Sequence, residues 1–482
     1  MSRLKQLGKD TLIYGFGALI SKSINFFLLP VYTRILTPSE FGTIEIITVL
    51  SYFLGSIIVM GSDTAQSVYF YKFENEGLIK QSQLVSSIVK LRLTIAFIII
   101  LFLTLFSPYL SNIFFMESIT PRVFWVALFG SIFTQIYAQS TEVLRLLFKP
   151  YKYILIIFFK TITTCTFIIF LILVFDLGIY GYFLGSLISC ILVSLLGWYA
   201  IRRYLRFDIL NLNLWPDLIK FGYPLFVSTI INYLMSTSDR LFIKYFFDSK
   251  ELAIFAIAAK FSMIASLTVA TFRTAWSPIA MKEMNKSGGE NLFQTISRIY
   301  MGCSCVLIIC LTYFSPFLIR LLTTSAYTES APIIGVISWQ AIFFGFYSII
   351  CIGLLKEEKT YIALPISILA LLFGIILNYL LVPNFASLGA AIATAITYAF
   401  WIILTMIYSN KYWRIKYNYL LFSFQILIAL FSYILITITA DRMPSGVLFI
   451  YVLFSCFYII SISLQPKEKT ILASKIRGII NI

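Results

Sequence analysis

Apolar runs of about 20 residues recur along the whole chain, and only short polar segments separate them. A helix of that length crosses about 30 Å of hydrocarbon. The longest polar segment, near residues 63–85, is too short to form a separate soluble domain. The composition agrees, because 12% of residues are charged, against about 25% in soluble domains. We therefore predict an all-α polytopic membrane protein.

The runs predict about 14 transmembrane helices, each with boundaries uncertain by about two to four residues. Twelve helices is the alternative count, and the least certain boundary is 176–180, which either separates two helices or bends one. The predicted spans are 11–30, 41–62, 86–107, 119–142, 153–175, 177–200, 218–237, 251–272, 296–320, 331–355, 361–383, 387–408, 419–439 and 446–464.

The distribution of lysine and arginine predicts the orientation, because cytoplasmic loops hold the excess of these residues. With the N-terminus inside, 27 of the 37 fall on the cytoplasmic side, seven on the outer side and three within spans. Both termini are therefore predicted to be cytoplasmic. The formal net charge of +16 then reflects topology and attraction to anionic lipid headgroups, and we expect no nucleic-acid partner.

The residues available for catalysis are few. The chain has no histidine, which excludes a serine-histidine triad, a histidine-ligated zinc site and the HExxH motif. It also lacks the Walker-type nucleotide-binding motif. Cys303 and Cys305 cannot share one face of a helix, which argues against a metal site. We predict a protein that is not an enzyme and that needs no metal or cofactor, because no loop is large enough to shape an active site.

Two short segments indicate an internal repeat. "SINFFLLPVYTRIL" at 23–36 resembles "TIINYLMSTSDRLF" at 229–242, and the next helix opens with Glu40 in the first copy and Glu251 in the second. The repeat predicts two six-helix halves, within 1–200 and 201–410, followed by two extra helices and a cytoplasmic tail in 411–482. Six helices is an even number, so the halves would be related by an axis along the membrane normal, with a cavity between them.

Lysines inside the spans point to the kind of passenger. A cation at the bilayer centre costs roughly 2.5 to 3.5 kcal/mol, so Lys22, Lys160 and Lys260 are expected to face protein or water. Lys160 lies about one third into its span and could instead extend to the interface. Arg34 and Arg240 either belong to solvated hairpins or form matching positive rims at the outer mouth of the cavity. An excess of buried cations favours an anionic passenger.

Four stretches carry a family resemblance. "LPVYTRILTPSEFGTIEI", "SDRLFIKYFFDSKELAIFAIAAKFS", "FRTAWSPIAMKE" and "ASLGAAIATAITY" together resemble the polysaccharide flippases of bacterial envelopes. These include the O-antigen flippases, within the exporter superfamily that also holds multidrug antiporters. The resemblance covers about 5–410. It implies two six-helix bundles in a V around a cationic central cavity, with two further C-terminal helices.

The resemblance also implies a function. Such a protein would pass a polyprenyl-pyrophosphate-linked oligosaccharide, such as an O-antigen repeat unit, across the bacterial inner membrane by alternating access. Its partners would be the lipid-linked oligosaccharide, membrane lipids and other polysaccharide assembly proteins. Arg273 has an alternative role as a positive anchor at a helix end. The candidate substrate-binding residues are Lys22, Asn25, Arg34, Lys160, Asn232, Arg240, Lys260 and Arg273.

Three other functions remain open from the sequence. A flippase for lipid II or another lipid-linked glycan differs only in its substrate. A multidrug cation antiporter should carry membrane carboxylates where this chain has lysines. A polysaccharide polymerase, the alternative from the enzyme class, should have a long outer loop that this chain lacks.

Overall fold

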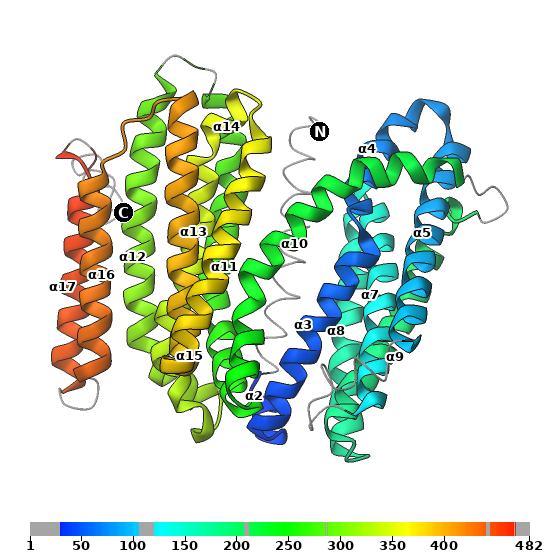
Figure 1. Ribbon diagram of the computed structural model, residues 1–482, viewed down its shortest axis with the longest axis horizontal. Helices are drawn as coiled ribbons and strands as arrows, with labels where there is room; N and C mark the ends of the chain where they lie inside the picture. The colour runs from blue at the N-terminus through cyan, green and yellow to red at the C-terminus, as the bar shows by residue number, and fades with distance from the viewer. Residues whose placement is uncertain are drawn as a thin grey trace, which may run out of the picture. The chain divides into compact units, whose positions relative to one another are not determined.

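The computed structural model describes residues 29–105, 120–206, 212–284, 286, 288–439, 444–466 and 468. These residues form helices and no strand (Figure 1). The chain forms two compact units, Met1–Thr237 and Ser238–Ile482, and the boundary between them falls within helix α10. We call them unit 1 and unit 2. The division predicted from the sequence, at residues 200 and 410, stays a prediction.

Unit 1 is built from helices that pack side by side along their length (Figure 1). Helix α9 lies between α7 and α8, and α3 packs on the other side of α7. The elements of unit 1 are α2 (Leu29–Ile35), α3 (Pro38–Val59), α4 (Ser62–Lys72), η1 (Glu74–Glu76), α5 (Leu78–Leu105), α7 (Pro121–Leu146), α8 (Pro150–Leu173), α9 (Gly178–Ile201), η2 (Arg202–Tyr204), η4 (Leu212–Leu214) and most of α10 (Trp215–Phe246).

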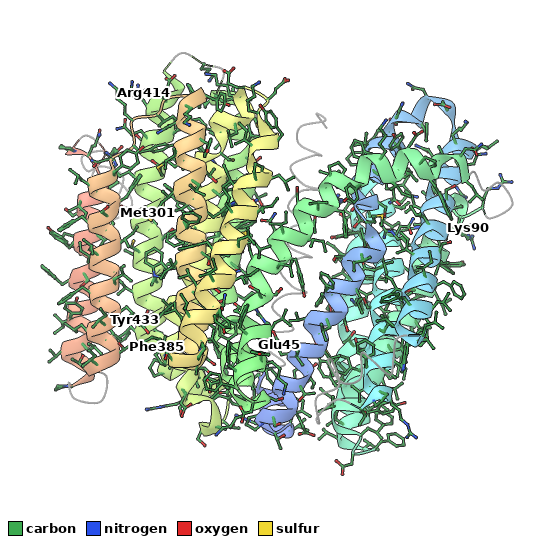
Figure 2. The ribbon with its side chains drawn as sticks, in the orientation of Figure 1. Glu45, Lys90, Met301, Phe385, Arg414 and Tyr433 are labelled. Atoms are coloured by element: carbon green, nitrogen blue, oxygen red, sulfur yellow. The ribbon has the colours of Figure 1, made fainter. Side chains whose placement is uncertain are left out.

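Unit 2 is centred on α13, which contacts α11, α12 and α15, while α16 and α17 pack against α12. Arg414 and Phe385 lie toward opposite ends of this unit (Figure 2). After the end of α10, its elements are α11 (Ser249–Glu283), α12 (Gly289–Leu322), η5 (Ser325–Ser330), α13 (Ala331–Ile350), α14 (Ile352–Lys356), η6 (Thr360–Ile362), α15 (Ala363–Tyr412), α16 (Tyr419–Thr439) and α17 (Ser445–Ser463).

Helix α15 is a hairpin of two helices. Fifty residues in one straight helix would extend about 75 Å, more than twice the thickness of the hydrocarbon core. The chain reverses at Ala386, whose φ of 48° and ψ of −132° are not helical. The two arms then meet, because the indole of Trp401 donates to the hydroxyl of Ser367 over 3.2 Å. The separate predicted spans 361–383 and 387–408 therefore correspond to the two arms.

The predicted spans match the helices closely. Each predicted span from 41–62 onward overlaps a helix or one arm of α15, and the gap between α8 and α9 separates the two spans that the sequence left uncertain. Eleven helical segments in the described part are long and apolar enough to cross a bilayer. The first predicted span, 11–30, lies outside the described residues, so the count of fourteen stays a prediction.

Helix α7 is missing from those eleven because one of its faces is polar, and this face packs against neighbouring helices. The hydroxyl of Ser131 donates to the backbone oxygen of Ser51 on α3 over 2.7 Å. The amide of Gln139 donates to the side chain of Gln66 on α4 over 3.0 Å. Both glutamines are buried. A polar group in hydrocarbon needs such a partner, so the polarity of α7 fixes its packing.

Arg92 on α5 is the most deeply buried cation among the described residues, with a side chain only 1% exposed. Its guanidinium donates to the hydroxyl of Ser62 over 2.9 Å, to the carboxylate of Asp63 over 2.5 Å and to the backbone oxygen of Gln135 over 3.1 Å. One side chain thus joins α4, α5 and α7. In the prediction of orientation, Arg92 counts among the charges of the cytoplasmic side. In the structure it lies midway along α5.

The internal repeat has a structural counterpart in each unit. Glu40 lies in the first turn of α3, and a side chain on Gly178, at the start of α9, would begin 3.2 Å from its carboxylate. Glu251 lies in the first turn of α11 and accepts the backbone N–H of Ser387 over 3.0 Å. Gly178 and Ala386 also share a positive φ, 49° and 48°. In both units an acidic residue therefore meets the first turn of the unit's later helix.

The close approach of α8 and α9 yields a test of the packing. A methyl group on Gly185 would begin 2.7 Å from the backbone nitrogen of Ile168. We expect Gly185→Ala to lower the unfolding free energy by about 1 to 3 kcal/mol, because the two backbones would have to separate. Gly446→Ala is the matched control, since nothing lies within 4 Å of its added methyl group. Thermal unfolding in detergent measures both variants, and equal melting temperatures would refute the contact.

A second test concerns the buried guanidinium. Arg92→Gln leaves Asp63 and the backbone oxygen of Gln135 without their donor, and we expect a loss of about 3 kcal/mol in stability. Arg203→Gln removes an equal charge from an exposed side chain and should change stability by less than about 0.5 kcal/mol. Chemical denaturation of the two purified variants measures the difference in stability. Similar midpoints would show that the Arg92 contacts do not stabilise the fold.

Candidate functional site

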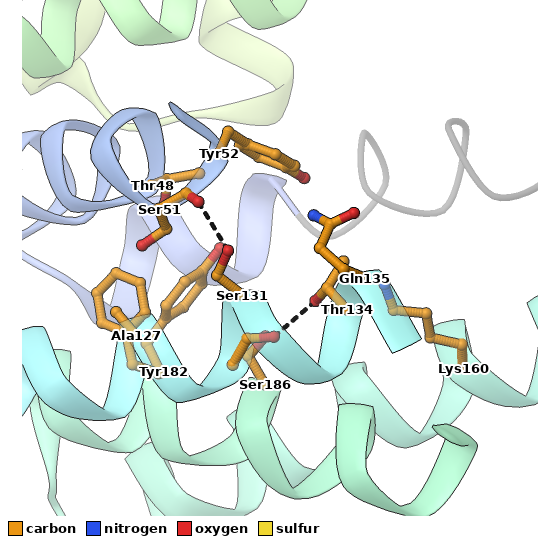
Figure 3. A pocket seen from close by; sticks show the side chains of 12 residues that line it. Thr48, Ser51, Tyr52, Ala127, Ser131, Thr134, Gln135, Lys160, Tyr182 and Ser186 are labelled. Carbon is orange, nitrogen blue, oxygen red and sulfur yellow. Dashed lines mark hydrogen bonds between the residues drawn. The ribbon is translucent and has the colours of Figure 1, made fainter. Parts of the chain in front are cut away.

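Unit 1 contains a polar pocket of about 140 Å³ between α3, α7, α8 and α9. Figure 3 shows hydroxyl and amide side chains from α3 and α7 facing one another across it, with Lys160 of α8 at one end. We call it the Lys160 pocket. Among the described residues that line it, none carries a carboxylate. The polar side chains that line it belong to Thr48, Ser51, Tyr52, Ser131, Thr134, Gln135, Lys160, Tyr182 and Ser186.

Lys160 has an aromatic neighbour in this pocket. It lies ten residues from the start of α8, which places it about 15 Å along the helix axis and near the middle of the span. Its ammonium sits 4.6 Å from the centre of the Tyr137 ring, and no carboxylate lies within ion-pairing distance among the described residues. The ring stabilises the cation without neutralising it. The explanation that Lys160 extends to the interface is therefore weaker than the sequence suggested.

The wall of the Lys160 pocket is held in place by the Arg92 contacts. The backbone oxygen of Gln135 accepts a hydrogen bond from the Arg92 guanidinium, and the side chain of Gln135 lines the pocket. That side chain also packs against α3, because a methyl group on Gly55 would begin 2.5 Å from the amide nitrogen. The position of the polar wall thus depends on the buried arginine one helix away.

Unit 2 contains a second pocket, of about 450 Å³, lined by α11, α13 and α14 and the residue that joins the last two. We call it the Arg273 pocket. Helix α11 continues to Glu283, more than two turns beyond the predicted end, so Arg273 lies within the helix instead of at its terminus. Hydroxyl side chains of Thr274, Ser277 and Ser348 also line this pocket.

Arg273 also has an aromatic partner. Its guanidinium lies 4.4 Å from the centre of the Phe344 ring, and Phe344 stacks on Trp401, with the ring centres 6.2 Å apart. Tyr347, which lines the pocket, stacks on the same indole at 4.2 Å. Among the described residues no carboxylate pairs with Arg273. An aromatic stack therefore supports the guanidinium and leaves its charge available to an anion.

Arg240 is different, because a neighbouring carboxylate compensates its charge. The side chain of Asp239 is only 1% exposed, and its carboxylate accepts a hydrogen bond from the Arg240 guanidinium over 3.1 Å. The hydroxyl of Thr394 donates to the other oxygen of Asp239 over 3.2 Å. The guanidinium also lies 5.4 Å from the ring of Phe255. The sequence pattern indicates Arg240 as a candidate but not Asp239, although the two are adjacent in the chain.

The remaining predicted residues that the structure describes do not line these two pockets. Arg34 is exposed in the last turn of α2. Asn232 is exposed on α10 and donates to the backbone oxygen of Ser228 over 2.8 Å. Lys260 is half-buried on α11. Lys22 and Asn25 lie outside the described residues.

The sequence matches two protein-family models and a known membrane protein. A model of the family described as "Polysaccharide biosynthesis protein" matches residues 7–284, and the MatE family model matches 224–380. The chain is 22% identical over 470 residues to an uncharacterized membrane protein of Methanocaldococcus jannaschii, covering 87% of this chain and 88% of that one.

Two solved structures share the fold at low sequence identity. The lipid II flippase MurJ in its inward closed conformation is 17% identical, with a TM-score of 0.73 over 94% of this chain and 98% of that chain. A multidrug resistance MATE family transporter of the MOP superfamily, in an inward-facing conformation, is 12% identical, with a TM-score of 0.62 over 81% and 94%. The resemblance seen in the sequence is confirmed at the level of family, and this multi-pass membrane protein belongs to the polysaccharide biosynthesis protein family.

Proposed function

We propose that this protein is a flippase that carries a polyprenyl-pyrophosphate-linked oligosaccharide across the bacterial inner membrane, an O-antigen repeat unit or a similar glycan. One observation carries the proposal. Each unit holds a cation within a membrane helix, Lys160 in unit 1 and Arg273 in unit 2, and each cation rests on an aromatic ring and not on a carboxylate.

The energetics of these cations favour an anionic passenger. A cation at the centre of the bilayer costs roughly 2.5 to 3.5 kcal/mol, while an aromatic ring returns about 0.5 to 2 kcal/mol. A carboxylate would remove the remaining positive charge, as Asp239 does for Arg240. Lys160 and Arg273 thus keep a charge that a pyrophosphate can satisfy, and charge-assisted bonds to phosphate are among the stronger hydrogen bonds in proteins.

The uncharged lining of the pockets suits the glycan part of the substrate. Hydroxyl groups donate and accept hydrogen bonds, as do the sugar hydroxyls that they would meet. Tyr52 and Tyr182 add aromatic surface to the Lys160 pocket, on which a sugar ring can pack. The polyprenyl chain is apolar and can stay in the bilayer while the head group crosses.

The two compact units suggest the mechanism. In transporters built from two repeats, one half moves against the other and exposes the binding site alternately to each side. We place both termini in the cytoplasm because the lysine and arginine excess lies on that side. Lys22, Asn25, Arg34, Asn232, Arg240 and Lys260 remain candidates for contacts with the substrate along its path.

A flippase for lipid II is the second candidate, because the solved structure with a TM-score of 0.73 is a lipid II flippase. Lipid II is also a lipid-linked glycan, so the same cations would serve. A multidrug cation antiporter fits less well, since no carboxylate lines the Lys160 pocket or the Arg273 pocket.

Deleting the gene separates these functions. We expect the deletion strain to accumulate complete repeat units on their lipid carrier at the cytoplasmic face, because synthesis continues while translocation stops. Protease-free spheroplasts probed with a membrane-impermeant glycosidase would report the side on which the units lie. Single units displayed on the outer face would instead indicate a polymerase, and a block confined to lipid II would assign the alternative substrate.

The two cations yield a sharper test. We expect Lys160→Ala and Arg273→Ala each to slow translocation of a pyrophosphate-linked glycan in proteoliposomes at least about tenfold, equivalent to about 1.4 kcal/mol. Lys160→Arg and Arg273→Lys keep the charge and should retain more activity than the alanine variants. The result is read as initial flipping rate at matched reconstitution and matched melting temperature.

Controls for this test come from the same helices. Lys152→Ala on α8 and Lys282→Ala on α11 remove exposed lysines that line neither pocket. Both should flip at the wild-type rate. Should the Lys160 and Arg273 alanine variants also flip at that rate while folding normally, the cations have no part in transport and the proposal fails.

A further inference from the structure

Helices α12, α16 and α17 of unit 2 are fastened together at one end. Arg298, near the start of α12, donates to both carboxylate oxygens of Glu468 over 2.7 Å. Gln425 on α16 donates to the hydroxyl of Ser463, at the end of α17, over 2.7 Å. The side chains of Gln425 and Ser463 are almost fully buried. This end of the three-helix group is closed by polar contacts.

The other end of the same group is open. There α12, α13, α16 and α17 surround a pocket of about 710 Å³, which we call the Arg320 pocket. It is larger than the two pockets of the candidate site and shares no lining residue with them. Its lining combines apolar residues such as Phe317 and Leu448 with the hydroxyls of Thr312 and Thr437.

A single charge lies in this lining. Arg320 is exposed near the end of α12 and has no carboxylate within ion-pairing distance among the described residues. Glu329, adjacent in the chain to the lining residue Thr328, is exposed and does not line the pocket. Among the described residues, the pocket therefore combines a long apolar surface with one cation that has no carboxylate partner.

We infer that the Arg320 pocket binds one molecule of an anionic membrane phospholipid. The phosphate would lie on the Arg320 guanidinium, since arginine matches phosphate geometry with paired donors. One acyl chain would fill the space between α12, α16 and α17, because an empty apolar void forfeits the dispersion contacts of its walls. The lipid would thus complete the packing of the two C-terminal helices at the end that the polar contacts leave open. This inference does not depend on the proposed transport function.

The experiment uses the purified full-length chain and phosphatidylglycerol, with phosphatidylcholine as the neutral comparison. Native mass spectrometry during lipid titration should show one phosphatidylglycerol per chain bound at least tenfold more tightly than phosphatidylcholine. Arg320→Ala should abolish that preference, because the phosphate loses its partner. Thr437→Phe, which places a ring in the pocket, should remove the high-affinity lipid itself.

Lys250→Ala is the matched control, since it removes an exposed cation of the same unit that does not line the pocket. It should bind phosphatidylglycerol as the wild type does. Equal binding of the two lipids, or undiminished selectivity in Arg320→Ala, would overturn the inference. So would displacement of phosphatidylglycerol by a stoichiometric polyprenyl phosphate, because the pocket would then belong to the substrate tail.

Discussion

The buried guanidinium of Arg92 is the contact on which the arrangement of unit 1 depends. A buried charge without hydrogen-bond partners carries a large free-energy cost. The packing of α4, α5 and α7 avoids this cost, because it brings Ser62, Asp63 and the backbone oxygen of Gln135 within reach of Arg92. The consequence extends to the candidate site, because Gln135 also forms part of the wall of the Lys160 pocket. The structural charge of Arg92 and the candidate site are thus connected through one residue of α7.

Four cations within the described helices have partners of two kinds. Arg92 and Arg240 have carboxylate partners, which compensate their charge. Lys160 and Arg273 have aromatic partners. A ring attracts a cation through its quadrupole and carries no net charge, so it does not neutralise the cation that it stabilises. The choice between a carboxylate and a ring therefore separates structural cations from cations that can hold an anionic ligand.

Much of the fold could be predicted from the sequence, because the bilayer imposes a simple length and polarity rule on each helix. The hairpin at Ala386 and the break between α8 and α9 follow the predicted spans. The partners of the charges could not be predicted, since they depend on contacts between distant segments. Arg92 meets a backbone oxygen 43 residues away, and no local pattern shows it. The aromatic partner of Arg273 lies on another helix for the same reason, whereas Asp239 is adjacent to Arg240 and its carboxylate was visible in the sequence.

The repeat has a physical basis that the short sequence match only suggested. The N–H groups in the first turn of a helix have no hydrogen-bond acceptor within that helix, and a carboxylate is a good acceptor for them. Glu251 fills this role for the second arm of α15, and Glu40 lies against the corresponding start of α9. Both starts follow a tight connection that requires a positive φ. In each unit an acidic residue from an earlier helix therefore lies where the N–H groups of a later helix need an acceptor.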